Sequence, residues 1–352
     1  MKKLLWLIFS GLIPLSFLFL ALYLFDPFQL YHKPYFRKPI FNSNMHYQAA
    51  GIINNYNFDS IILGSSIMVN TSSKEASSKL GGTWVNLSVS GGGIAERIAI
   101  LKHSLRKQKI QNLIFTLEPG WLKDEDESKN RYGYLYDSNP LNDFKTYLDK
   151  SFIGCFFISK ICLKGEESMD RPSQFFSQAW FGELLGGFSS WIKNANRPDT
   201  QKILHSIANY KPTDSSPENH QPIIPVSLFQ IIEQNPNIDF IFIVPPFSRL
   251  SYKLSPTYPT KAIKSLLQKK FSNVKVYGFD NTSIPDDLSR YVDLVHYDEK
   301  VNSFMIDAIK NDTHRITLEN IDNYFQEMKR KIDAYDIEPL RKQIIESGVL
   351  AK

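Results

Sequence analysis

Apolar residues fill the first 25 positions of the chain almost without interruption. Lys2 and Lys3 precede a run from Leu4 to Phe25 that contains few serine, glycine or proline residues and no charged ones. A run of about 20 apolar residues is long enough to span a bilayer as a helix. By the positive-inside rule, the two lysines keep the N-terminus in the cytoplasm and place the rest of the chain outside it. The pattern predicts an uncleaved, single-pass anchor over residues 1–25.

Two other interpretations of this run remain open. A cleaved signal peptide has a shorter apolar stretch and a cleavage site of small residues, whereas this run ends in Leu22-Tyr23-Leu24-Phe25. A helix of a soluble core usually carries a polar face, and the run has none. Residues 26–57, whose first half is rich in Pro, Tyr, Phe and Lys, are predicted to be a juxtamembrane connector, because Tyr and Phe suit the membrane interface.

Downstream of residue 57, short apolar segments alternate with segments of helical spacing. Strands are expected at residues 60–63, 83–89, 112–117, 240–244 and 274–279, and helices at 95–107, 226–233, 260–271 and 299–310. Strands that alternate with helices favour a parallel sheet covered by helices on both faces. The predicted fold class is therefore α/β, and sites in such sheets lie at the carboxyl ends of the strands.

Two stretches depart from this alternation. Residues 123–220 are polar and aromatic-rich and lack strand runs, so we expect a helical insertion inside an α/β domain that covers 58–315. The tail, 316–352, has a helical pattern over 317–335 that either packs on the core or binds a partner. Its apolar positions are Leu318, Ile321, Tyr324, Phe325, Met328 and Ile332.

The composition is that of an ordinary globular protein. Of 352 residues, 43% are hydrophobic and 22% charged, and the net charge is +5. This charge is spread along the chain without an arginine-rich run, so we expect no nucleic-acid partner. Cys155 and Cys162 are the only cysteines. They allow one local bridge or two buried thiols, but no disulfide framework.

One serine stands where a nucleophile is expected. Gly64-Ser65-Ser66 directly follows the first predicted strand. A serine hydroxyl is a poor nucleophile until a base takes its proton, and a histidine base needs an acid to orient it. Among the seven histidines, only His296 follows the last predicted strand and stands three residues after an aspartate, Asp293. We therefore expect Asp293 to bind one imidazole nitrogen while the other reaches Ser66.

The other candidates for chemistry are weaker. His103 is expected at an exposed helix position, and His205, His220 and His314 have no carboxylate arrangement typical of zinc. The glycines at 91–93 lack a Walker lysine. We therefore expect neither a metal nor a nucleotide or other cofactor. Gly-Ser-Ser and Asp-x-x-His also occur by chance in turns, so only their joint placement is informative.

Three segments resemble a known family. Gly64-Ser65-Ser66, residues 86–92 (Asn-Leu-Ser-Val-Ser-Gly-Gly) and Asp293-Leu294-Val295-His296 resemble the first, second and last blocks of the SGNH (GDSL-like) hydrolase superfamily. The similarity is closer to its membrane-anchored bacterial branches, which include the teichoic-acid D-alanylation and alginate O-acetylation proteins. It covers roughly residues 58–335 and implies a flavodoxin-like α/β domain.

The resemblance also implies roles for residues. Ser66 corresponds to the nucleophile, His296 to the general base and Asp293 to the residue that orients it. The backbone N–H groups of Ser66 and of Gly91 or Gly92 correspond to the oxyanion hole, which stabilises the charge of the transition state. One departure is Glu118, which stands where the third block of the family supplies an asparagine donor, because an ionised carboxylate cannot donate a hydrogen bond. Glu118 is expected either to bind a sugar hydroxyl or to have a structural role.

Two functions follow from the resemblance. The first is an extracytoplasmic serine esterase or O-acyltransferase at the inner membrane. It would act on an envelope glycan or a lipid-linked polymer, with a multipass membrane O-acyltransferase as a possible partner. The second is a non-catalytic protein that keeps the fold and binds or assembles an envelope acylation complex. The missing asparagine and the aromatic-rich insertion favour this alternative.

Overall fold

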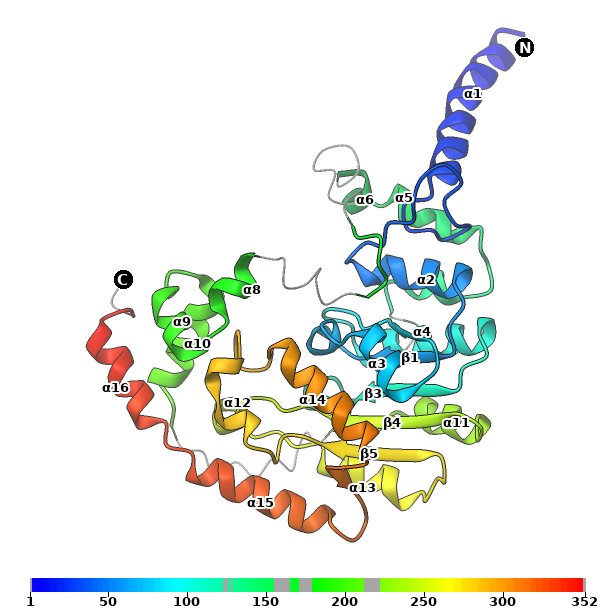
Figure 1. Ribbon diagram of the computed structural model, residues 1–352. Helices are drawn as coiled ribbons and strands as arrows, with labels where there is room; N and C mark the ends of the chain where they lie inside the picture. The colour runs from blue at the N-terminus through cyan, green and yellow to red at the C-terminus, as the bar shows by residue number, and fades with distance from the viewer. Residues whose placement is uncertain are drawn as a thin grey trace.

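A six-stranded sheet forms the centre of the protein. The computed structural model describes residues 2–122, 126, 128, 130–154, 165–170, 179–211 and 222–350. The strand order is β2-β1-β3-β4-β5-β6, and only β6 is antiparallel to its neighbour. Figure 1 shows β1, β3, β4 and β5 at the centre of the body. The strands are β1 (Ser60–Leu63), β2 (Trp84–Asn86), β3 (Asn112–Thr116), β4 (Asp239–Val244), β5 (Val274–Gly278) and β6 (Arg315–Ile316). The predicted α/β class and the five parallel strands are confirmed, whereas β6 was not predicted.

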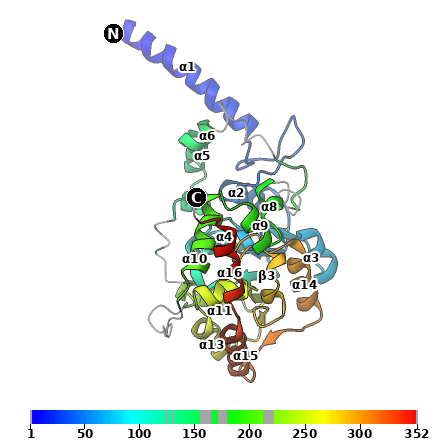
Figure 2. The same ribbon diagram turned by 90° about the vertical axis from the view of Figure 1, so that its left-hand side faces the viewer.

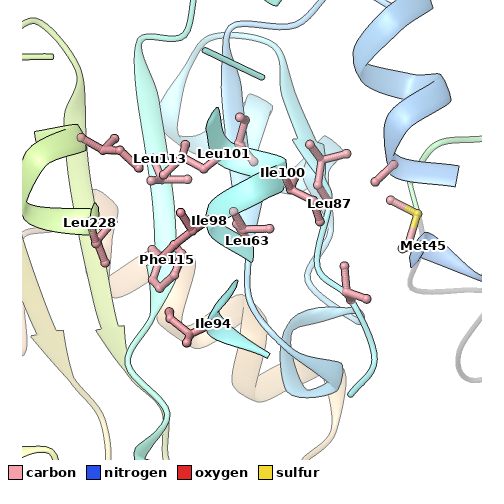
Figure 3. Packing of buried hydrophobic residues seen from close by; sticks show 14 of the residues in the cluster. Met45, Leu63, Leu87, Ile94, Ile98, Ile100, Leu101, Leu113, Phe115 and Leu228 are labelled. Carbon is pink, nitrogen blue, oxygen red and sulfur yellow. The ribbon is translucent and has the colours of Figure 1, made fainter. Parts of the chain in front are cut away.

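The sheet is buried on both faces because apolar residues occupy consecutive positions of its strands. Successive side chains of a strand point to opposite faces. Leu113 and Phe115 of β3 pack into one core with α4 (Ile94–Lys107) (Figure 3). Ile114, which lies between them, packs into the other core with α14 (Glu299–Lys310). Helices on both faces are typical of parallel sheets.

The other helices of the described residues complete these layers or lie outside them. They are α1 (Lys2–Phe25), α2 (Met45–Asn55), α3 (Ser73–Leu80), α5 (Lys145–Leu148), α6 (Lys150–Gly154), α8 (Ala179–Leu184), α9 (Phe188–Lys193), α10 (Pro198–Ala208), α11 (Val226–Gln234), α12 (Arg249–Leu254), α13 (Thr260–Gln268), α15 (Ile321–Ala334) and α16 (Glu338–Ser347). The helices predicted at 95–107, 226–233, 260–271 and 299–310 correspond to α4, α11, α13 and α14. Neither α3 nor α16 was predicted.

The N-terminal helix α1 projects from the rest of the molecule (Figure 2). In the part of the chain that the structure describes, no helix combines the length and the apolar character needed to cross a membrane. The anchor over residues 1–25 stays a prediction.

The segment predicted as a connector, 26–57, is folded onto the domain. Its second half forms α2, whose buried side chains belong to the same core as β3 and α4. Its first half is held by the Asp26 carboxylate, which accepts hydrogen bonds from the backbone N–H groups of Leu30, Tyr31 and His32 at 2.9, 2.8 and 3.1 Å. The buried hydroxyl of Tyr147, in α5, donates to the same carboxylate. The Asp26 carboxylate thus holds the start of this segment, and Phe28, Leu30 and Phe41 pack the rest of it into the main core.

The insertion and the tail are helical in their described parts. In the described residues of 123–220 the elements are the helices α5, α6, α8, α9 and α10, together with short 3-10 turns and an isolated bridge between Glu166 and Phe41. In α15, Ile321, Met328 and Ile332 are buried, which supports the core-packing interpretation of the tail. Cys155 and Cys162 lie outside the described residues.

Replacement of Asp26 by alanine should release the segment that follows α1. Each backbone N–H that loses its buried partner costs about 1–3 kcal/mol, so residues 26–42 should open more often. Limited trypsin digestion should cut after Arg37 at least about tenfold faster than in the wild type. Asp199→Ala, whose side chain is 93% exposed, is the control. Equal cleavage rates in the three proteins would contradict the role given to Asp26.

Candidate active site

Ser66 begins the first turn after β1. The backbone at Gly64 passes so close to Met68 and Thr116 that a Cβ there would overlap with their side chains. The Gly64 N–H donates to the Ser88 hydroxyl at 3.0 Å, and the Asn86 amide donates to the Met68 carbonyl at 2.7 Å. Residues at and just after the end of β2 therefore fix both ends of the turn that carries Ser66.

A buried carboxylate holds the residue just before Ser66. Glu118 follows β3, the neighbour of β1, and accepts a hydrogen bond from the Ser65 N–H at 3.1 Å. The Ser65 hydroxyl donates to its other oxygen. The Thr116 hydroxyl and the Arg97 guanidinium, the latter at 3.2 Å, donate to Glu118 as well. Glu118 is 1% exposed and Arg97 0%.

These contacts assign Glu118 the structural role that the sequence left open. Its carboxylate is enclosed by donors from the protein itself, so it positions the Ser65–Ser66 turn and is not presented to a sugar. Sequence reasoning placed Glu118 near the site but missed its bond to Ser65. The signal was available, because β1 and β3 were predicted and the residues that follow adjacent parallel strands meet at one edge of the sheet.

The structure brings Ser66, His296 and Asp293 together although 230 positions separate the first two. The Ser66 Oγ lies 2.7 Å from the His296 Nε2, and the His296 Nδ1 lies 2.7 Å from the Asp293 Oδ2. The other Asp293 oxygen accepts the backbone N–H groups of Val295 and His296, each at 2.8 Å. The carboxylate is thereby locked against the ring that it orients.

Asp293 and His296 each shift the pKa of the other. Burial alone lowers the pKa of the His296 imidazole, but the charge and hydrogen bond of Asp293, with a smaller contribution from Glu118, outweigh burial and raise this pKa above its usual value. Burial raises the pKa of the Asp293 carboxyl, but the His296 charge, the ring N–H and the two backbone N–H groups outweigh it and lower this pKa. Asp293 is therefore ionised at neutral pH.

A tight loop carries His296 and Asp293 from β5 to α14. The Val292 N–H donates to the His296 carbonyl at 2.9 Å, and the Asp298 N–H donates to the Arg290 carbonyl at 2.9 Å. Asp298 then caps α14 by accepting the Val301 N–H. We refer to residues 290–298 as the His296 loop. Its base is closed by its own backbone, so its tip needs further contacts to keep a fixed position over Ser66.

From the sequence, the oxyanion donors are expected to be the backbone N–H groups of Ser66 and of Gly91 or Gly92. Among the described residues, neither the Ser66 nor the Gly91 N–H donates to a protein acceptor. Gly91 has a φ of +71°, which favours glycine, and is exposed. The Gly92 N–H instead donates to the Val89 carbonyl at 3.0 Å. Of the two glycines named from the sequence, only Gly91 has a free donor.

A hollow of about 630 Å³ lies elsewhere, beside the end of β5. Its lining includes Arg290, Lys300, Phe304 and Arg315 but none of Ser66, Asp293 and His296. His103 also lies away from the site and is buried, contrary to expectation. Its imidazole binds the Asn54 side-chain oxygen at 2.8 Å, and burial lowers its pKa to about 4.

No protein-family profile matches the chain, and no curated protein matches it. The chemical interpretation of the site therefore depends on its geometry. A nucleophile bound to a base, with the base bound to an ionised acid, is the arrangement that activates a serine for acyl transfer.

An NMR titration of His296 should give a pKa above the value of about 6.5 for an unperturbed histidine. Asp293→Asn removes the nearest negative charge, so the pKa of His296 should fall. Glu118→Gln removes a more distant charge and should lower it less. Asp307→Asn, on the far part of α14, is the control and should leave it unchanged. If the pKa of His296 were the same in Asp293→Asn as in the wild type, the charge of Asp293 would not be its cause.

Proposed function

We propose that the protein is a serine-dependent esterase or O-acyltransferase of the SGNH type. The observation that carries this proposal is the Ser66 hydroxyl 2.7 Å from the His296 Nε2, with the Asp293 carboxylate 2.7 Å from the other ring nitrogen. The position of Ser66 at the carboxyl end of a parallel strand also supports it. So does the resemblance of the three segments 64–66, 86–92 and 293–296 to the blocks of that superfamily.

In the first step, the Ser66 Oγ attacks the carbonyl carbon of an acyl ester, and the Ser66 proton passes to the His296 Nε2. The charged imidazole is stabilised by Asp293, and the oxyanion accepts the N–H groups of Ser66 and Gly91. Collapse breaks the ester bond, and His296 returns the proton to the leaving alkoxide. The product is an alcohol and an acyl-Ser66.

In the second step, His296 takes a proton from water or from a sugar hydroxyl, which attacks the acyl-Ser66. The Ser66 Oγ leaves and is protonated by His296, so the enzyme is restored. Water gives hydrolysis, and a sugar hydroxyl gives acyl transfer. Because a base must be neutral to accept a proton, kcat/KM should rise with pH through the raised pKa of His296.

The proposed substrate is an acylated envelope glycan or a lipid-linked polymer on the extracytoplasmic side of the inner membrane. The apolar run over residues 4–25 supports this location. In the resembling branches such proteins work with a multipass membrane O-acyltransferase, and we propose a partner of that kind for acyl transfer.

A second candidate function is binding or assembly without turnover. It is favoured by Glu118, which replaces an asparagine donor and is fully engaged with Ser65, Thr116 and Arg97. The oxyanion site then has backbone donors only. Removal of one such donor costs a hydrolase about 10²–10³-fold in kcat. An experiment must therefore distinguish a slow enzyme from a protein that keeps the fold but has no activity.

A fluorophosphonate probe separates them, because it reacts only with an activated serine. The full-length wild type should be labelled, and Ser66→Ala should not. Ser65→Ala is the matched control: it removes a neighbouring hydroxyl but leaves the nucleophile, so it should be labelled more slowly. On a short-chain aryl ester, Ser66→Ala and His296→Ala should each lower kcat at least about 10³-fold.

Absence of labelling in a folded wild type would reject the esterase proposal. It would favour the binding function, which predicts that Ser66→Ala and His296→Ala retain full biological activity.

A further inference from the structure

The part of the His296 loop that leads to Asp293 is held by a helix of the insertion. The Trp191 indole N–H, in α9, donates to the Val292 carbonyl at 2.6 Å. The Gly187 N–H, just before α9, donates to the Tyr291 carbonyl at 2.9 Å. These two carbonyls stand immediately before Asp293. Their bonds therefore fix the peptide plane from which the Asp293 side chain extends.

The approach of α9 to the loop is close and needs glycine. Gly187 has a φ of +61°, and a Cβ there would overlap with the Leu288 carbonyl. Trp191 itself is 0% exposed. A donor buried in this way stays directed at its acceptor, because loss of the hydrogen bond would leave both groups unsatisfied without water.

The C-terminal helix α16 supports α9 from the other side. Ile344 of α16 is 1% exposed and shares a cluster with Trp191 and with Leu204 of α10. The Arg341 guanidinium donates to the Ala208 carbonyl at the end of α10 at 3.3 Å. Figure 1 shows α16 beside α9 and α10. We call α9, α10 and α16 the clamp helices.

The α/β body holds the loop at other points. The Ser248 N–H and hydroxyl, at the start of α12, donate to the Leu294 carbonyl at 3.0 and 2.7 Å, and the Tyr291 hydroxyl donates to the Pro246 carbonyl. Neither contact is made to the peptide between Val292 and Asp293. Among the described residues, Trp191 is the side chain that holds this peptide.

We propose that the clamp helices are a positioning element for Asp293 and His296 and act through the Trp191 indole N–H. This inference rests on the proposed function, because it gives the insertion and the tail a part in aligning the base with Ser66. Alignment matters because a base displaced by a fraction of an ångström transfers a proton less efficiently. Trp191 is a positioning residue: it contacts the loop and not the reacting atoms.

The test compares Trp191→Phe with Trp84→Phe in the full-length protein. Both substitutions keep a ring and remove one buried indole N–H. The Trp84 indole N–H, in β2, donates to the Gly81 carbonyl at 2.7 Å and not to the His296 loop. The readouts are the His296 pKa by NMR, and kcat and KM on a short-chain aryl ester.

Trp191→Phe should lower kcat about three- to tenfold with KM nearly unchanged, as expected when one hydrogen bond is lost. It should also lower the pKa of His296, because the loosened Asp293 supports the charged ring less. Trp84→Phe should change neither, even if it destabilises the protein equally. Since the NMR signal of native His296 comes only from folded molecules, lost stability does not decide the outcome.

Ile344→Ala tests the same link from α16, with its neighbour Ile345→Ala, 71% exposed, as the control. Only Ile344→Ala should lower the pKa of His296 and kcat. This pair keeps the test decisive if Trp191→Phe does not fold.

The two proposals fail differently. A wild type that neither turns over esters nor reacts with the probe overturns the proposed function, and the titration still reports on positioning. A His296 pKa that is the same in the wild type, Trp191→Phe and Ile344→Ala overturns the positioning role whatever the activity. A pKa lowered equally by Trp84→Phe also overturns it, because the effect would not be specific to the clamp helices.

Discussion

The burial of the Glu118 carboxylate is the constraint on which the site depends. A charge removed from water is tolerated only when it is paired and its oxygens accept hydrogen bonds. Arg97 supplies the pairing, and Ser65 and Thr116 supply further donors. Because this charge cannot move without losing its partners, the turn after β1 is tied to β3, and Ser66 keeps one position at the edge of the sheet.

Much of the fold was accessible from the sequence because the strands are short apolar runs bounded by glycine, proline or polar residues. The edge strand β6 was missed because two residues carry no periodic pattern. The helix α2 was assigned to a connector because its aromatic surroundings resemble a membrane interface as much as a core. Composition alone does not separate the two, whereas the burial of Ile52 and Ile53 does.

The site was predictable where its residues stand in short motifs and unpredictable where they meet through tertiary structure. Ser66 and the Asp293–His296 pair follow the first and last predicted strands, so topology brings them to one edge. Trp191 and Val292 lie 101 positions apart and join elements whose packing no local pattern encodes. Glu118 was noted because it cannot donate a hydrogen bond, and its role as an acceptor for Ser65 could have been inferred from the adjacency of β1 and β3.

The attachment of α1 has a consequence for the orientation of the face that carries Ser66. The Phe19 ring contacts Phe144, with centroids 4.8 Å apart, and the His32 imidazole binds the Tyr23 carbonyl at 2.7 Å. Arg37 donates to the Phe25 carbonyl, which closes the last turn of the helix against the body. These contacts restrict rotation of the body relative to α1. Any surroundings that fix the orientation of α1 therefore also fix the direction in which Ser66 faces.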